Sequence, residues 1–236
     1  MEREVERAKL RQRLSAIEER ILAACARANR KREDVKIIAV TKYVDADAIG
    51  DLLAVGVQDI GENRVQNALP KYERYGDQGT WHFIGHLQTN KVKEVVGRFS
   101  LIHSLDRLSL AEAINKRGQQ LNHVVSCLLQ VNISGEKTKF GLSPNDVLAF
   151  LQETSNMRHI RIAGLMTMAP HVENPEETRP VFRGLREWKD RINGWNFPHA
   201  QIEHLSMGMS NDFEVAIEEG ATYVRLGSVL VKPSES

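Results

Sequence analysis

Lys42 lies two residues after a run of apolar residues, Ile37 to Val40, that is typical of a buried β-strand. A lysine in such a place is usually a solvated group at the end of the strand. The amine of a lysine can instead act as a nucleophile that binds a carbonyl group covalently. The position of Lys42 therefore allows two interpretations, and residues elsewhere in the chain are needed to decide between them.

Small residues near the end of the chain suggest a site for an anion. They follow two strand-like segments: Ser206, Gly208 and Ser210 lie in LSMGMSND, and Gly227 and Ser228 come after TYVRL. A helix start is expected at Ser210 or Asn211, and the N–H groups at a helix start attract phosphate. The same residue types are common in ordinary turns, so this pattern taken alone favours a turn.

Arg225 lies inside the last strand-like segment, between Val224 and Leu226. A buried guanidinium needs a partner, because an unpaired buried charge is costly. The partner is either a structural acid or a group of a ligand, such as an acid or an aromatic nitrogen. A lysine amine, phosphate-binding loops and a partner for a ring nitrogen together suit pyridoxal 5′-phosphate (PLP).

The segments that must position these groups alternate between strand-like and helical patterns. An amphipathic helix is expected over the first thirty residues, with an apolar stripe at Leu10, Leu14, Ile17, Ile21 and Cys25. Eight strands are expected at 35–40, 57–63, 80–85, 100–105, 124–132, 160–168, 201–207 and 222–228. The fold class is therefore α/β, a (β/α)8 TIM barrel with an extra N-terminal helix. An open doubly wound sheet is the alternative, but the first strand–helix turn, VTKYVDAD, lacks GxGxxG.

Capping residues predict where two of the helices begin. Ser109 followed by Glu112 matches a capping box, and Ser143 before Pro144 matches an N-cap with proline at the first helical position. In a barrel the active site lies at the carboxyl ends of the strands. Strands one and eight become neighbours when the barrel closes, so Lys42 and Arg225 are expected to lie on the same side of the site.

Composition excludes several classes of protein. The 236 residues carry 32 basic and 31 acidic side chains, so no overall field attracts nucleic acid or an anionic membrane. Cys25 and Cys127 lie far apart without a CxxC pattern, which argues against a zinc site or a disulfide framework and favours a reducing cytoplasm. The charged N-terminus does not match a signal peptide. We expect one barrel domain over residues 1–236.

Six segments resemble, in order, the motifs of the PLP homeostasis protein family, the YggS-like proteins: AVTKYV, DIGENRVQ, WHFIGHLQTNK, VNISGEKTKFGL, GLMTMAP and HLSMGMSNDFEVAIEEGATYVRLGS. The resemblance runs from Val35 to the last strand. Each motif alone is weak, but the ordered set is specific. The family is similar to the barrel domain of alanine racemase and of eukaryotic-type ornithine decarboxylase.

The resemblance implies a role for each matching residue. Lys42 would hold PLP as a Schiff base, and Arg225 would face the pyridine nitrogen. The phosphate would be held by Ser206, Ser210 and the backbone of Gly227 and Ser228.

Three further residues are expected around the cofactor. Asn63 would lie near it, and Lys139 falls where racemases have an arginine near the phenolic oxygen. Met168 stands where racemases tend to have a histidine against the ring. This is a departure, because a methionine packs but does not orient a ring by hydrogen bonding.

The resemblance favours a carrier that binds PLP, takes part in intracellular PLP homeostasis and cofactor supply, and has little turnover. Arginine keeps its proton, so Arg225 would leave the ring nitrogen unprotonated and a weak electron sink. Strand eight ends near Leu230 and only VKPSES follows, so we expect no second domain of the racemase kind. The implied partners are PLP and PLP-dependent apoenzymes, without nucleic acid or membrane, and we expect a monomer.

Two other functions remain open at this point. A small racemase or decarboxylase would use Lys42 as one base and a second base from among His86, His103, Tyr43 and His204. A phosphate-binding barrel without PLP would use the loops after strands seven and eight alone.

Overall fold

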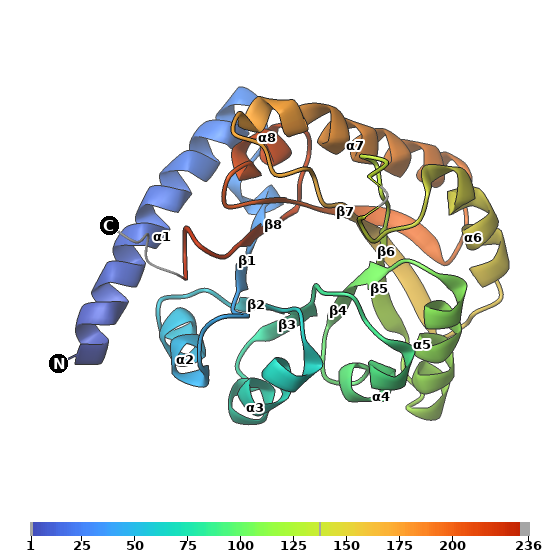
Figure 1. Cartoon of the computed structure of the whole chain (residues 1–236), viewed down its shortest axis with the longest axis horizontal. Helices are drawn as coiled ribbons and strands as arrows, with labels where there is room; N and C mark the ends of the chain where they lie inside the picture. The colour runs from blue at the N-terminus through green and yellow to red at the C-terminus, as the bar shows by residue number, and fades with distance from the viewer. Residues whose placement is uncertain (1, 137, 232–236) are drawn as a thin grey trace.

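Eight parallel strands close into a barrel in the computed structural model, which describes residues 2–136 and 138–231 (Figure 1). Each strand pairs with the strands before and after it along the chain, and β1 also pairs with β8. The strands are β1 (Lys36–Val40), β2 (Asp59–Glu62), β3 (Thr80–Phe83), β4 (Leu101–Leu105), β5 (Val125–Gln130), β6 (Ile160–Met166), β7 (Ala200–Met209) and β8 (Tyr223–Leu226). The predicted (β/α)8 class is therefore confirmed.

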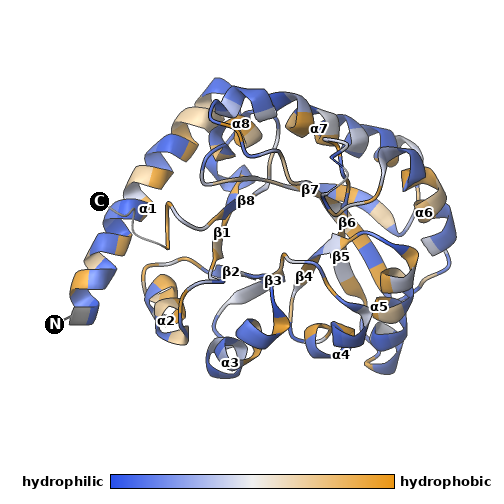
Figure 2. Cartoon of the chain, in the orientation of Figure 1, coloured by the Kyte–Doolittle hydropathy of each residue, from blue (hydrophilic) through white to orange (hydrophobic). Residues whose placement is uncertain are grey.

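Helices surround the barrel and cover its outer surface (Figure 1). The α-helices are α1 (Glu2–Arg27), α2 (Ala46–Ala54), α3 (Val65–Tyr75), α4 (Val92–Val95), α5 (Leu108–Gln120), α6 (Val147–Thr154), α7 (Arg179–Gly194) and α8 (Phe213–Glu218). Short 3-10 helices lie at Arg32–Asp34, Thr89–Lys91, Pro144–Asp146 and Pro175–Thr178. Hydrophilic and hydrophobic residues alternate along these helices, as expected when one side of each is buried (Figure 2). No helix among the described residues is long and apolar enough to span a membrane.

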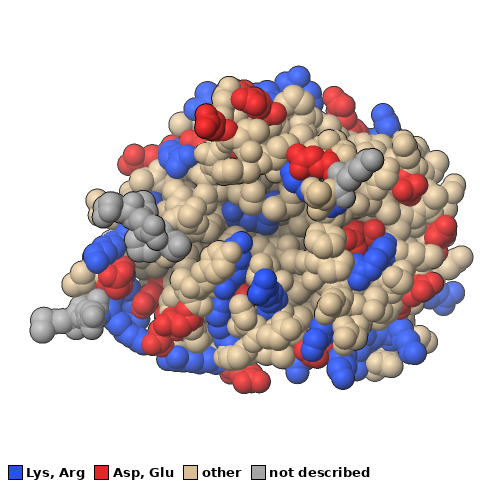
Figure 3. Space-filling model, viewed as in Figure 1, with Lys and Arg blue, Asp and Glu red and all other residues tan. Residues whose placement is uncertain are grey.

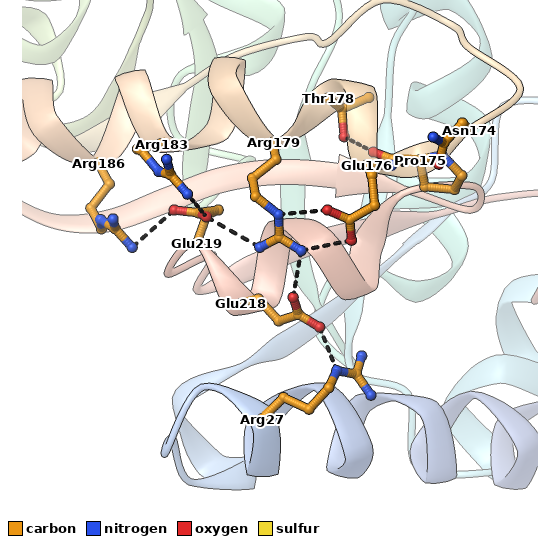
Figure 4. Close-up of polar contacts among 10 residues, drawn as sticks. All are labelled: Arg27, Asn174, Pro175, Glu176, Thr178, Arg179, Arg183, Arg186, Glu218 and Glu219. Atoms are coloured by element: carbon orange, nitrogen blue, oxygen red, sulfur yellow. Dashed lines mark hydrogen bonds and ion pairs between the residues drawn. The ribbon is translucent and has the colours of Figure 1, made fainter.

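The predicted N-terminal helix is confirmed as α1, which packs against α8 and α2. Its stripe faces inward, with Leu10, Ile17, Ile21 and Cys25 buried. A group of ion pairs joins α1 to α7 and to the end of α8 (Figure 4). Arg27 binds Glu218 of α8 at 2.6 Å, and Arg179 of α7 binds both Glu218, at 2.6 Å, and the buried Glu219, at 3.2 Å.

Helix starts are less well predicted than strands. Ser143 does cap its helix, since its Oγ accepts a hydrogen bond from the Asn145 N–H at 3.3 Å. The prediction that Ser109 caps its helix is wrong, because α5 already begins at Leu108 and has no side-chain cap. The expected start at Ser210 or Asn211 is also wrong, because α8 begins at Phe213. The Asp212 carboxylate accepts a hydrogen bond from the Met209 N–H at 2.7 Å, and this short turn delays the helix.

Two apolar regions fill the molecule. The larger lies between the barrel and the helices, and the smaller is formed by side chains that include Ile38, Leu128 and Tyr223. Alternate residues of a strand share one face, so Arg225 lies on the same face of β8 as Tyr223, and this face lines the barrel interior. The interior therefore contains polar groups as well as apolar ones.

Candidate functional site

The closed barrel brings the two ends of the chain together. In the ladder between β1 and β8, Ala39 pairs with Leu226, so the residues after each strand emerge side by side. Lys42 follows β1 by two residues and is half-buried, with its Nζ 4.7 Å from the centre of the Tyr43 ring. Lys and Arg side chains gather around a hollow near the middle of the face viewed in Figure 3.

Asn63 directly follows β2, which pairs with β1, so it emerges on the same side of the barrel as Lys42. The Thr41 N–H donates to the Gly61 carbonyl at 3.0 Å, which aligns the residues that follow each strand. Oδ1 of Asn63 is buried and has no hydrogen-bond partner among the described residues. Asn63 also lines a groove of about 500 Å³, together with Arg64, His86 and Lys91. A buried acceptor without a partner is costly, so this position suits a ligand that brings a donor.

Arg225 is held firmly in the barrel interior. Its Nη1 donates to Ser206 Oγ at 2.6 Å, and its Nη2 donates to the Thr167 carbonyl at 3.0 Å and contacts Met168 Sδ at 3.2 Å. Burial lowers the pKa of Arg225 to about 10, although the charge of Asp212 acts to raise it. The guanidinium therefore stays charged at neutral pH. Its Nε has no acceptor within hydrogen-bond distance among the described residues, so this donor is available to a ligand.

The loop after β7 and the loop after β8 form a cluster of hydrogen-bond donors. Ser210 Oγ accepts from the N–H groups of Gly227 and Val229 at 3.3 and 3.4 Å, so its own O–H is left to donate. The N–H groups of Ser210 and Ser228 have no acceptor in the described part of the chain. Backbone and hydroxyl donors that are left without an acceptor suit an anion such as phosphate.

Ser206 is placed differently from the other predicted phosphate ligands. It is fully buried, and it lies within β7 because this strand extends to Met209 rather than ending at 207. Its Oγ is engaged by Arg225 at 2.6 Å and by His103 Nδ1 at 2.9 Å. Ser206 therefore supports Arg225 from inside the barrel, and the structure does not place it with Ser210 in the donor cluster.

Met168 and Lys139 meet on the β6 side of the site. Met168 is half-buried and follows β6, so its sulfur reaches Arg225 as described above. Lys139 Nζ lies 3.5 Å from the Met168 carbonyl and 2.9 Å from the Glu136 carboxylate. Lys42, Asn63, Met168, Ser210, Arg225, Gly227 and Ser228 thus all lie at or just after the carboxyl ends of strands, and Lys139 is adjacent to Met168.

The residues considered as a second base are scattered. His103 is fully buried in the interior, and His204 packs on Tyr223 at the first residue of β8, with ring centres 5.0 Å apart. His86 stacks on Phe140 with ring centres 4.3 Å apart, and Tyr43 is 78% exposed. His103 and His204 therefore lie away from the carboxyl ends of the strands.

Sequence reasoning missed a buried ion pair beneath Lys42. Lys71 Nζ donates to Glu62 Oε1 at 2.6 Å and to the Thr41 carbonyl at 2.7 Å, and Thr41 Oγ1 donates to the same carboxylate oxygen at 2.6 Å. These contacts fix the backbone immediately before Lys42. A signal was present in the sequence: Lys71 shares the buried face of α3 with Val65 and Ala68, where an apolar residue is expected.

Comparison with protein families and curated proteins gives consistent matches. The family model for the alanine racemase N-terminal domain matches residues 12–235. A pyridoxal phosphate homeostasis protein of Aquifex aeolicus is 47% identical over 220 residues, which are 93% of this chain and 96% of that protein. The protein of the same name from Escherichia coli K12 is 32% identical over 222 residues, covering 92% of this chain and 93% of that protein.

Solved structures show the same fold. The structure of PipY of Synechococcus elongatus with PLP bound is similar with a TM-score of 0.82 and 33% identity, covering 94% of this chain and 99% of that chain. Alanine racemase of Clostridium difficile is similar with a TM-score of 0.66 and 18% identity, covering 93% of this chain and 57% of the racemase chain. The second likeness shows the barrel fold alone.

Proposed function

Because the chain belongs to the family of pyridoxal phosphate homeostasis proteins, which share the alanine racemase N-terminal barrel, we propose that it binds PLP and takes part in intracellular PLP homeostasis. Lys42 holds the cofactor as a Schiff base, and turnover is low. The observation that carries the proposal is that three kinds of donor lie toward the carboxyl ends of the strands: the Lys42 amine, the Arg225 guanidinium and the Ser210 donor cluster.

These residues fit the chemical groups of PLP. PLP, when bound, supplies an aldehyde that a lysine amine can hold covalently. The O–H of Ser210 and the N–H of Ser228 suit its phosphate, and the Nε–H of Arg225 suits its ring nitrogen. Oδ1 of Asn63, which has no partner among the described residues, suits a donor on the ligand.

The state of Arg225 favours binding over catalysis. Its guanidinium keeps its proton at neutral pH, because the pKa of about 10 leaves a wide margin. It therefore donates to a ring nitrogen and leaves that nitrogen without a proton of its own. Such a ring withdraws fewer electrons from a substrate, so it gives less help to a carbanion at the substrate's α-carbon. Release to PLP-dependent apoenzymes in the cytoplasm, from a monomeric single-domain barrel, is part of the same proposal.

Borohydride reduction followed by peptide mapping tests the role of Lys42. The wild-type protein incubated with PLP is expected to carry a pyridoxyl group on Lys42. Lys42→Ala is expected to lose the covalent bond but to keep measurable PLP affinity through the Ser210 cluster. Lys36→Ala is the matched control, since Lys36 is exposed at the opposite end of β1. Absence of a pyridoxyl group on Lys42 would refute the proposal.

Turnover is measured separately with single L-amino acids in deuterium oxide. Slow exchange of the α-proton is expected, at a rate close to that of free PLP. Fast α-deuteration together with racemisation would contradict the carrier function, even if Lys42 binds the cofactor.

A further inference from the structure

A chain of side-chain hydrogen bonds runs through the barrel interior from Asp59 to Arg225. Asp59 Oδ1 lies 2.8 Å from His82 Nε2, and His82 Nδ1 lies 3.0 Å from His103 Nε2. His103 Nδ1 lies 2.9 Å from Ser206 Oγ, which lies 2.6 Å from Arg225 Nη1. We call these five residues the interior relay. Asp59 is the first residue of β2, so the relay begins at the end of the barrel opposite to Lys42.

At the Arg225 end of the relay, the chemistry of the guanidinium decides which group donates and which accepts in each hydrogen bond. A guanidinium only donates, so Ser206 Oγ must accept from it. The single hydroxyl proton of Ser206 then needs an acceptor of its own. His103 Nδ1 is the acceptor in contact with it, so His103 carries its proton on Nε2 and donates to His82 Nδ1. His82 therefore also carries its proton on Nε2.

The other end of the relay demands the same direction. An ionised carboxylate only accepts, so Asp59 requires a proton on His82 Nε2. In the reverse direction, His82 would need a second proton to keep its bond to Asp59. Ser206 would then receive donors from both Arg225 and His103, and its own proton would lack an acceptor among the described residues. The two ends thus agree on one arrangement of protons.

The surroundings of His103 keep its ring neutral. Burial is the main cause that lowers the pKa of His103 well below its ordinary value, and the positive charge of Arg225 acts in the same direction. Tyr223 of β8 packs against both rings, with centres 5.4 Å from His82 and 5.8 Å from His103. Asp59 is the acid in contact with the pair. A fixed tautomer of each ring is the result.

We propose that Asp59, His82, His103 and Ser206 are positioning residues that fix the orientation of Arg225 through one directed relay. The relay holds a lone pair of Ser206 toward Nη1, which leaves Nε of Arg225 directed at the ligand. A change in the hydrogen bonding of Asp59, at the far end of the barrel, thereby changes how Arg225 is held against the cofactor ring. The arrangement of the relay does not depend on PLP, whereas its effect on the cofactor ring rests on the proposed function.

The direction of the relay is measured on the protein without cofactor. Two-bond ¹H–¹⁵N correlation spectra at pH 7 are expected to show both His82 and His103 with the proton on Nε2. Asp59→Asn is expected to relax this constraint, because an amide can present either an acceptor or a donor to His82. His204→Gln is the control, since His204 packs on Tyr223 outside the relay. A proton on Nδ1 of either ring in the wild-type protein would overturn the assignment.

The effect on the ligand is measured by PLP titration and by the absorption spectrum of the bound cofactor. Ser206→Ala removes the acceptor of a charged hydrogen bond and is expected to weaken PLP binding about tenfold. It is also expected to change the spectrum, and Asp59→Asn to cause a smaller change of the same kind. His204→Gln is expected to leave both unchanged. Wild-type affinity and spectrum in Ser206→Ala would overturn the positioning role, whereas failure of the wild-type protein to bind PLP would overturn the proposed function alone.

Discussion

Replacement of Lys71 by methionine is expected to destabilise the fold strongly, although Lys71 lies outside the ring of strands. Glu62 is fully buried, and the Lys71 side chain is 7% exposed, with 2.6 Å between Nζ and Oε1. Without the ammonium, the carboxylate would keep one hydrogen-bond donor, Thr41 Oγ1, and its Oε2 already has no partner among the described residues. Removing one member of a buried pair typically costs about 3–5 kcal/mol in free energy of unfolding.

This magnitude is large enough to measure in two ways. Urea unfolding at pH 7 should give the loss directly, and the melting temperature should fall by roughly 6–20 °C for a protein of this size. The matched control is Lys91→Met, because Lys91 and Glu94 form an ion pair at 3.3 Å with side chains 32% and 25% exposed. A pair that exposed is worth less than about 1 kcal/mol.

A double variant separates the loss of stability caused by breaking the Lys71–Glu62 ion pair from the loss caused by poorer packing. Glu62→Leu with Lys71→Met removes both charges, so it is expected to be more stable than Lys71→Met alone. The Thr41 carbonyl loses its Lys71 partner in the single variant and in the double variant, so PLP binding at Lys42 should weaken in both variants. If Lys71→Met costs no more than Lys91→Met, then the interaction does not fix the backbone before Lys42, and the reasoning fails.

Two further predictions concern acid stability and Gly208, a glycine with positive φ near the end of β7. Burial acts to raise the pKa of Glu219, but Arg183, Arg179 and Arg186 outweigh it and hold the pKa below its ordinary value, and the pKa of Glu218 is lowered likewise. The ionised Glu219 and Glu218 therefore stabilise the fold above the unfolded pKa of about 4.3, and this stabilisation is lost as the pH falls through the folded pKa. Glu219→Gln should consequently flatten a plot of the urea midpoint against pH between 7 and 3. Gly208→Ala should cost about 2–4 kcal/mol by urea unfolding, because φ is +91° and a Cβ would lie 2.5 Å from that of Ala216. Gly194→Ala, with open space around it, should be close to neutral, and equal losses in the two variants would contradict the strain argument.

Much of the fold could be predicted because periodicity is local information. Apolar runs such as Ile37 to Val40 mark strands, and the spacing of Leu10, Ile17 and Ile21 marks the buried face of α1. Helix starts were harder to predict, since Ser109 has the right residue type but lies inside α5. A capping pattern indicates that a side chain is able to accept a hydrogen bond from a helix N–H group. It does not indicate whether such an N–H group lies next to that side chain in the folded protein.

The sequence by itself determined the class of fold, the order of the motifs and the side of the barrel toward which Lys42, Asn63, Ser210 and Arg225 lie, because parallel strands of a closed barrel all present their carboxyl ends on one side. The tertiary structure decided the bonding of individual groups. Ser206 turned out to support Arg225, and Glu62 to pair with Lys71, through contacts between segments distant in the chain. Buried polar groups must find partners, and which partner each one finds depends on strand register and side-chain packing, which no local pattern encodes.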